Sequence, residues 1–162
     1  MKPLPNGAKV VVIGGGVVGC SCAYHIAKLG WKDVVLLERD KLTSGTTWHA
    51  AGLVSQIGPS AAITKLRKYT LDLYKELEKK VDHSAGLRLN GALSIAQNEG
   101  RWQELKRQAT TAQLYNFDVQ ILNKNQIKEN IPLINNEDLL GGILMPGDGS
   151  ADPSGVTQML AK

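Results

Sequence analysis

The amino-acid sequence predicts an α/β fold, in which a strand–turn–helix–strand unit leads into a mixed α+β region. Residues 9–13 (KVVVI) and 33–37 (DVVLL) are short apolar runs rich in β-branched residues, as is typical of strands buried on both faces. A glycine-rich turn, GGGVVG, follows the first run, and residues 20–29 are expected to form a helix that ends at Gly30. Beyond the second run the alternation of strand and helix stops, which predicts a change of architecture.

An amphipathic helix is the next expected element. It should run from about Ser60 to Val81, because apolar residues recur at intervals of three or four, with Thr70 filling one gap. The predicted apolar stripe consists of Ile63, Leu66, Leu73, Leu77 and Val81.

The remaining elements are a helix over residues 99–115, a short helix that ends near Pro132, and a last helix that begins at Asp152–Pro153. Aspartate suits the N-cap of that last helix and proline its first position. The helix over residues 99–115 presents one apolar face, which is formed by Trp102, Leu105, Ala109 and Ala112. Short strands are expected at residues 87–89, 93–96, 119–122 and 143–145.

Composition and charge are those of a globular chain, with 162 residues, 43% hydrophobic and 21% charged. Basic and acidic residues are interleaved, as in residues 75–80 (KELEKK), which predicts a solvated helix face and no nucleic-acid partner. Cys20 and Cys22 diverge on a helix, so neither a disulfide nor a cysteine-rich metal site is expected. No apolar run is long enough for a membrane span, and a first strand at Lys9 leaves no room for a targeting peptide, so a cytoplasmic location is expected.

Three segments are predicted along the chain. Residues 1–58 form the first part of a nucleotide-binding domain, residues 59–146 contribute to the nucleotide and substrate region, and residues 147–162 start a helix that returns to the first domain. Two parallel strands are too few for a covered parallel sheet, and the last helix has no stop signal before Lys162. We therefore expect the chain to be an N-terminal piece of a longer protein.

Gly14, Gly16 and Gly19 give the spacing G-x-G-x-x-G between the first predicted strand and helix, and Glu38 ends the second strand. In this context the first glycine permits a tight turn, the second lets a pyrophosphate approach, and the third lets helix and strand pack closely. Phosphates would bind at the helix N-terminus, and Glu38 would accept hydrogen bonds from ribose hydroxyls and repel a 2′-phosphate. The pattern predicts a Rossmann-like dinucleotide site. FAD is favoured over NAD because the chain leaves the βαβ alternation so early.

Three segments together resemble a known family: residues 11–30 (VVIGGGVVGCSCAYHIAKLG), 33–54 (DVVLLERDKLTSGTTWHAAGLV) and 145–155 (MPGDGSADPSG). The chain resembles the FAD-dependent amine oxidoreductases of the glycine oxidase and D-amino acid oxidase-like superfamily, in their dimethylglycine and sarcosine dehydrogenase branch. The resemblance covers residues 9–162, and its most specific part is Thr47-Trp48-His49.

The resemblance implies that His49 carries FAD covalently, through an imidazole nitrogen bonded to the flavin 8α-carbon. A neutral imidazole is a nucleophile near neutral pH, which agrees with that role. Small residues of the loop would leave room for the flavin, Thr46 and Thr47 would offer hydroxyls to phosphate or ribitol, and Trp48 would either pack on the flavin or anchor the loop. The expected cofactor-binding residues are Gly14, Gly16, Val17, Val18, Gly19, Glu38, Arg39, Gly45, Thr46, Thr47, Trp48, His49, Ala50, Ala51, Gly52 and Leu53.

The resemblance also implies the reaction. A small methylated amino acid, sarcosine or dimethylglycine, would transfer a hydride to flavin N5 and leave an iminium, which is hydrolysed to formaldehyde or passes its carbon to tetrahydrofolate. Electrons would go to an electron-transfer flavoprotein or to oxygen, and a eukaryotic full-length protein would lie in the mitochondrial matrix. No catalytic residue other than the tether is assigned in this chain, and no metal ligand.

Three alternatives stay open: a flavoprotein oxidase of another small amine or amino acid with non-covalent FAD, a non-enzymatic regulatory relative, and an NAD-dependent dehydrogenase. Thr47-Trp48-His49 argues against the regulatory branch. His25 and His83 are expected to be structural, and Asp148 and Asp152 are expected to be turn and cap residues.

Overall fold

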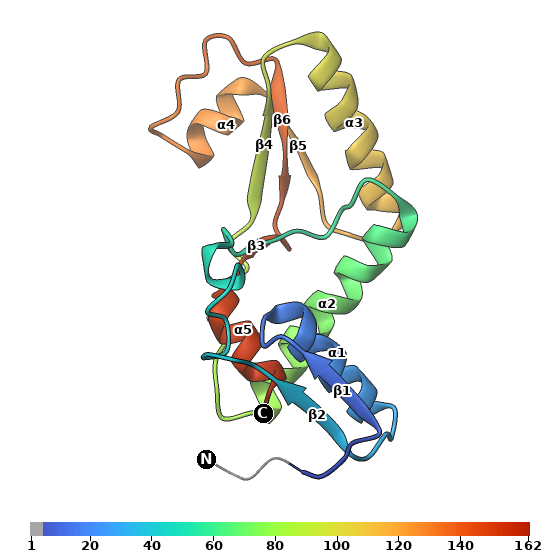
Figure 1. The fold of residues 1–162 in the computed structure, drawn as a ribbon. Coiled ribbons are helices and arrows are strands. Elements are labelled where there is room, and N and C mark those ends of the chain that lie inside the picture. The colour runs from blue at the N-terminus through green and yellow to red at the C-terminus, as the bar shows by residue number, and fades with distance from the viewer. Residues whose placement is uncertain (1–4) are drawn as a thin grey trace. The chain divides into compact units, whose positions relative to one another are not determined.

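The computed structural model describes residues 5–162, which divide into two compact units (Figure 1). The first unit comprises the chain up to Gly52 together with Asp72–Leu87 and Ala151–Lys162, and the second comprises Leu53–Leu71 and Arg88–Ser150. The predicted α/β class is confirmed. The three segments 1–58, 59–146 and 147–162 stay a prediction about functional domains, since the compact units follow other boundaries and divide within one helix.

The first unit contains the predicted strand–turn–helix–strand arrangement. Strands β1 (Val10–Ile13) and β2 (Val34–Leu37) pair in parallel, with Val10 opposite Val34 and Ile13 opposite Leu37. Helix α1 (Val17–Lys28) connects them and begins three residues earlier than the sequence suggested. The turn therefore passes into the helix directly after Gly16, which is its N-cap.

The prediction that both strands are buried on both faces is wrong for the described residues. Val11 is 50% exposed and Ile13 84% exposed, and Leu37 is exposed as well. On the other face, Leu36 packs against the core that includes Cys20 of α1. An apolar, β-branched composition favours a buried strand, but whether each face of the strand is buried depends on which elements cover it.

The core of the first unit joins α1 to helix α5 (Pro153–Leu160) and to the C-terminal half of helix α2 (Ala61–Lys80). Its buried members are Cys20, Leu73, Leu77, Ala85, Val156, Met159 and Leu160. Asp152 caps α5 as expected, since its carboxylate accepts hydrogen bonds from the N–H groups of Ser154 and Gly155, both at 3.0 Å. Both cysteines are free thiols.

Helix α2 keeps only part of its predicted apolar stripe. Leu73 and Leu77 are buried, but Ile63 and Leu66 are exposed, and Thr64 and Leu71 are the buried residues nearby. The hydroxyl of Thr64 accepts the N–H of Gly58 at 3.1 Å, which explains why a polar residue lies inside. Because the two halves of α2 belong to different units, one stripe does not describe the whole helix.

The second unit is built on a three-stranded antiparallel sheet with the order β4 (Ala92–Ala96), β6 (Gly141–Met145) and β5 (Gln120–Leu122). Helix α3 (Glu99–Leu114) and helix α4 (Lys124–Asn130) lie on opposite sides of it (Figure 1). Leu105 and Ala109 of α3 pack on Ala96 and Ile143. On the opposite face the core consists of Leu122, Ile127 and Leu139, with Leu93, Ile134 and Leu144 packed against it.

Three small elements were not expected from the sequence. A 3₁₀ turn, η1, covers Thr47–His49, and strand β3 (Leu53–Val54) pairs antiparallel with β7 (Gly149–Ser150). The strand expected at residues 87–89 is wrong, because only Arg88 forms an isolated bridge, opposite Ser150. Among the described residues, no helix is both long and apolar enough to cross a bilayer.

Candidate functional site

The glycine turn has the backbone geometry that its spacing predicts. Gly14 has a φ of +109°, which side-chain-bearing residues rarely adopt, and its N–H donates to the carbonyl of Leu37 at 2.8 Å. A Cβ at Gly19 would lie 1.9 Å from the carbonyl oxygen of Gly14. A glycine at position 19 therefore lets α1 run directly against the turn.

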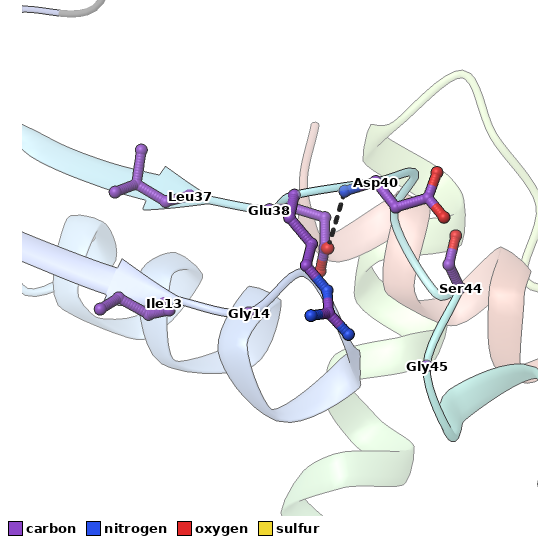
Figure 2. A pocket seen from close by; sticks show the side chains of 8 residues that line it. Ile13, Gly14, Leu37, Glu38, Asp40, Ser44 and Gly45 are labelled. Carbon is purple, nitrogen blue, oxygen red and sulfur yellow. Dashed lines mark hydrogen bonds between the residues drawn. The ribbon is translucent and has the colours of Figure 1, made fainter.

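Glu38 is held by the same turn. One carboxylate oxygen accepts the N–H of Gly15 at 2.6 Å and the other accepts the N–H of Asp40 at 3.0 Å, the contact drawn in Figure 2. These N–H groups, that of Gly15 first, hold the pKa of Glu38 below its ordinary value. The residue is therefore ionised at neutral pH, and a carboxylate has further lone pairs with which to accept hydroxyl hydrogen bonds.

A cavity of about 600 Å³ lies where β1 and β2 end (Figure 2). Its volume is within the range of small-molecule sites. Four of the predicted cofactor residues line it, namely Gly14, Glu38, Arg39 and Gly45. Its other lining residues, Ile13, Leu37, Asp40 and Ser44, were missed by sequence reasoning. The signal for them was available, because ligands of parallel sheets bind beyond the carboxyl ends of the strands.

The loop after β2 is tied back to the glycine turn. Thr43, with a φ of +74°, donates its N–H to the carbonyl of Gly15 at 3.0 Å. The hydroxyl of Thr47 accepts the N–H of Val17, the first residue of α1, at 3.1 Å. Thr47 is only 8% exposed, whereas the side chain of Thr46 is exposed. Thr46 thus has the free hydroxyl of the pair, and that of Thr47 faces the protein.

Trp48 and His49 lie side by side on η1. Their ring centroids are 3.7 Å apart and the planes are tilted by 33°. Trp48 is 58% exposed and His49 is exposed as well, so both rings are accessible to a ligand. The structure adds a contact that the sequence did not predict, since Trp48 packs on the neighbouring imidazole.

The small residues after His49 have different roles. Ala50 and Ala51 are exposed, as residues that leave space for a ligand should be. Gly52 has a φ of +71°, and a Cβ there would lie 2.2 Å from the carbonyl oxygen of Ala151. A close approach of two backbones therefore accounts for this glycine. Leu53, the last predicted cofactor residue, lies in β3 and is exposed.

Of the residues predicted to be structural, His25 lies within α1, where its Nδ1 is 2.7 Å from the carbonyl oxygen of Ser21. His83 follows α2 and its Nε2 is buried. Asp148 does more than form a turn, because its carboxylate accepts the N–H of Gln56 at 2.9 Å and burial raises its pKa. Among residues 5–162, no cluster of three or more His, Cys, Asp or Glu side chains is placed to hold a metal ion.

Known proteins match this chain over nearly its whole length. A family model described as "FAD dependent oxidoreductase" matches residues 9–162. The mitochondrial sarcosine dehydrogenase of Homo sapiens is 44% identical over 99% of this chain and 18% of its own length. The mitochondrial dimethylglycine dehydrogenase of Rattus norvegicus is 40% identical over 95% of this chain and 18% of its own length.

A solved structure shows the same fold. The L-proline dehydrogenase of P. horikoshii matches with a TM-score of 0.87 and 26% identity, over 98% of this chain and 41% of that chain. The chain spans about a fifth of the length of the two curated relatives, 18% in each case.

Proposed function

Because this chain belongs to the FAD-dependent oxidoreductase family, we propose that it forms the dinucleotide-binding part of an enzyme that oxidises N-methyl groups of small amino acids. The substrate class is sarcosine or dimethylglycine, since the relatives that are 44% and 40% identical are named for those two amines. FAD bound here would accept the hydride from the amine C–N bond and leave an iminium product.

The residues of the first unit fit the adenosine and phosphate parts of FAD. The N-terminus of α1 directs N–H groups and a positive dipole end toward the turn, which favours phosphates. Glu38 borders the cavity with an ionised carboxylate for ribose hydroxyls. The chain would position the cofactor, and no catalytic residue that acts on the amine is proposed among its 162 residues.

We propose further that His49 is the covalent tether to the flavin 8α-carbon. Its imidazole is exposed. Nearby in the sequence are Gly45, Ala50 and Ala51, which are also exposed and have little or no side chain. The histidine also lies in the same unit as the glycine turn. Besides Glu38, Gly45, His49, Ala50 and Ala51, the proposed set of cofactor-binding residues comprises Gly14, Gly16, Val17, Val18, Gly19, Arg39, Thr46, Thr47, Trp48, Gly52 and Leu53.

Partners and location follow from the proposed activity. Reduced flavin would pass electrons to an electron-transfer flavoprotein, and tetrahydrofolate would capture the one-carbon unit on a part of the protein outside this chain. The two curated relatives are both named as mitochondrial, so a matrix location is proposed for a eukaryotic full-length protein.

The observation that carries the proposal is the glycine turn, Glu38 and the Thr47–His49 turn within one compact unit of a chain of this family. The test uses protein expressed from the complete reading frame. Its intact mass is measured after acid denaturation and the modified peptide is mapped, with His49→Ala as control. One FAD on the peptide that contains His49, absent from the control, together with amine-dependent flavin reduction by sarcosine or dimethylglycine, is the expected result.

Other outcomes identify the alternatives. Flavin released on denaturation, with reduction by a different amine, would identify an oxidase with non-covalent FAD. A colourless protein at the unmodified mass would contradict the flavoenzyme proposal and favour a regulatory relative.

A further inference from the structure

We propose that Thr47 is the positioning residue for covalent attachment of the flavin at His49, because it anchors the histidine-bearing turn to the first residue of α1. The inference deepens the proposed function and rests on it. It assigns a specific role to the threonine of Thr47-Trp48-His49, whose hydroxyl accepts the N–H of Val17.

The anchor joins segments that are far apart in the sequence. The first N–H groups of a helix lack partners within the helix, and that of Val17 is satisfied by the Thr47 hydroxyl at 3.1 Å. The fit is close, since a Cβ on Gly16 would lie 3.0 Å from the same oxygen. The glycine at the N-cap thus leaves room for Thr47 to reach the helix.

Thr47 is the buried anchor of the loop over residues 44–52. Among residues 44–52, all of which the structure describes, Thr47 alone is buried, and its neighbours Thr46 and Trp48 are exposed. Two backbone hydrogen bonds make η1 a compact turn: the N–H of His49 donates to the carbonyl of Thr46 at 3.2 Å, and the N–H of Ala50 donates to that of Thr47 at 3.1 Å. A displacement of Thr47 would therefore carry His49 with it.

Attachment depends on placement because it joins two specific atoms. Attachment would form a bond between an imidazole nitrogen of His49 and the flavin 8α-carbon, and it would break the N–H bond of the imidazole and one C–H bond of the flavin 8α-methyl group. The two protons and two electrons released would be taken by dioxygen, which would be reduced to hydrogen peroxide. Misplacing a reacting group by about 1 Å can slow a reaction by about 100-fold, so a loosened turn should attach flavin slowly even where FAD still binds.

The test compares Thr47→Val, which keeps the shape and removes the acceptor, with Thr47→Ser, which keeps the hydroxyl. Both are made in the protein expressed from the complete reading frame, purified without flavin and incubated with FAD. Acid-stable flavin fluorescence is followed over time and divided by total bound FAD. We expect Thr47→Val to slow attachment by about tenfold or more, and Thr47→Ser to stay within about twofold of the unsubstituted protein.

The controls separate this inference from the proposed function. His49→Ala sets the level without attachment, and Thr47→Ala replaces Thr47→Val should the latter not fold. Normal attachment in the variant that lacks the hydroxyl would overturn the inference alone. Equal loss in Thr47→Ser and Thr47→Val would overturn it too, because size rather than the hydrogen bond would then matter. Absence of acid-stable flavin in the unsubstituted protein would overturn the tether as well.

Discussion

The N-termini of α1 and α4 are built in opposite ways. Helix α4 begins with a complete capping box, in which the Asn123 side chain accepts the N–H groups of Asn125 and Gln126, and the Gln126 side chain accepts the N–H of Asn123. Helix α1 has a glycine at its N-cap, and its first N–H is met only by Thr47 from a distant loop. The capping box of α4 satisfies N–H groups of its own helix end, whereas the N-terminus of α1 leaves N–H donors available for a ligand.

The largest expected effect comes from a substitution that prevents α1 from packing closely against the glycine turn. In Gly19→Ala the new Cβ would overlap the carbonyl oxygen of Gly14, 1.9 Å away. Overpacking of this kind costs about 1–3 kcal/mol, and the backbone oxygen cannot rotate away, so a value near 3 kcal/mol is expected. Urea unfolding measures it, with Gly7→Ala as matched control, because a Cβ at Gly7 meets nothing within 4 Å. Equal stability of the two variants would contradict the geometry.

The second-largest effect is expected from a substitution that caps the N-terminus of α1. Gly16→Ser places a hydroxyl where it can cap α1, and its Cβ would lie 3.0 Å from the Thr47 hydroxyl oxygen. A capped end competes with phosphate for the same N–H groups, so FAD affinity should fall about tenfold or more, as loss of a hydrogen bond to a charged group does. Titration of apoprotein with FAD measures the change, and unchanged affinity would show that phosphates do not use this end.

Removing the cap of α4 should affect stability and leave FAD binding unaffected. Asn123→Ala deletes the acceptor for two N–H groups, and loss of an N-cap side chain costs about 1 kcal/mol. Thermal unfolding and FAD titration together check this pair of outcomes. A drop in FAD affinity as large as that of Gly16→Ser would break the contrast between the two ends.

The smallest effect concerns Glu38 and pH. Its pKa is held below the ordinary value of 4.5, so its carboxylate stabilises the fold above that value, and this stabilisation is lost as pH falls through the folded-state pKa. Glu38→Gln removes the charge, so the stability difference between the two proteins should shrink as the pH is lowered below about 4.5. Urea unfolding at several pH values tests it, and a difference that grows on acidification would reverse the assigned sign.

A structural feature can be predicted from the sequence when it requires particular residue types at fixed spacing. The tight turn and the close packing of helix on strand require glycine, so the turn at Gly14 and Gly19 and the acid at Glu38 could be predicted from their spacing. The hydrogen bond between Thr47 and Val17 could not be predicted, because it joins residues thirty positions apart through one hydroxyl and requires no recognisable sequence motif. Burial of Ile13 and Leu66 was misjudged for another reason, since apolar composition does not say which faces neighbouring elements cover.

The backbone crossings between the two units have a consequence for how such a protein can diversify. The chain leaves the first unit after Gly52, re-enters it for Asp72–Leu87 and re-enters it again at Ala151. The N–H of Ala151 donates to the carbonyl of Gly52 at 2.8 Å. The N–H of Asp152 donates to the carbonyl of Ala85 at 2.7 Å, near another crossing. Because main-chain atoms form these links, side-chain substitutions in residues 53–71 and 88–150 leave the donors and acceptors in place, so the second unit can vary in sequence without removing them.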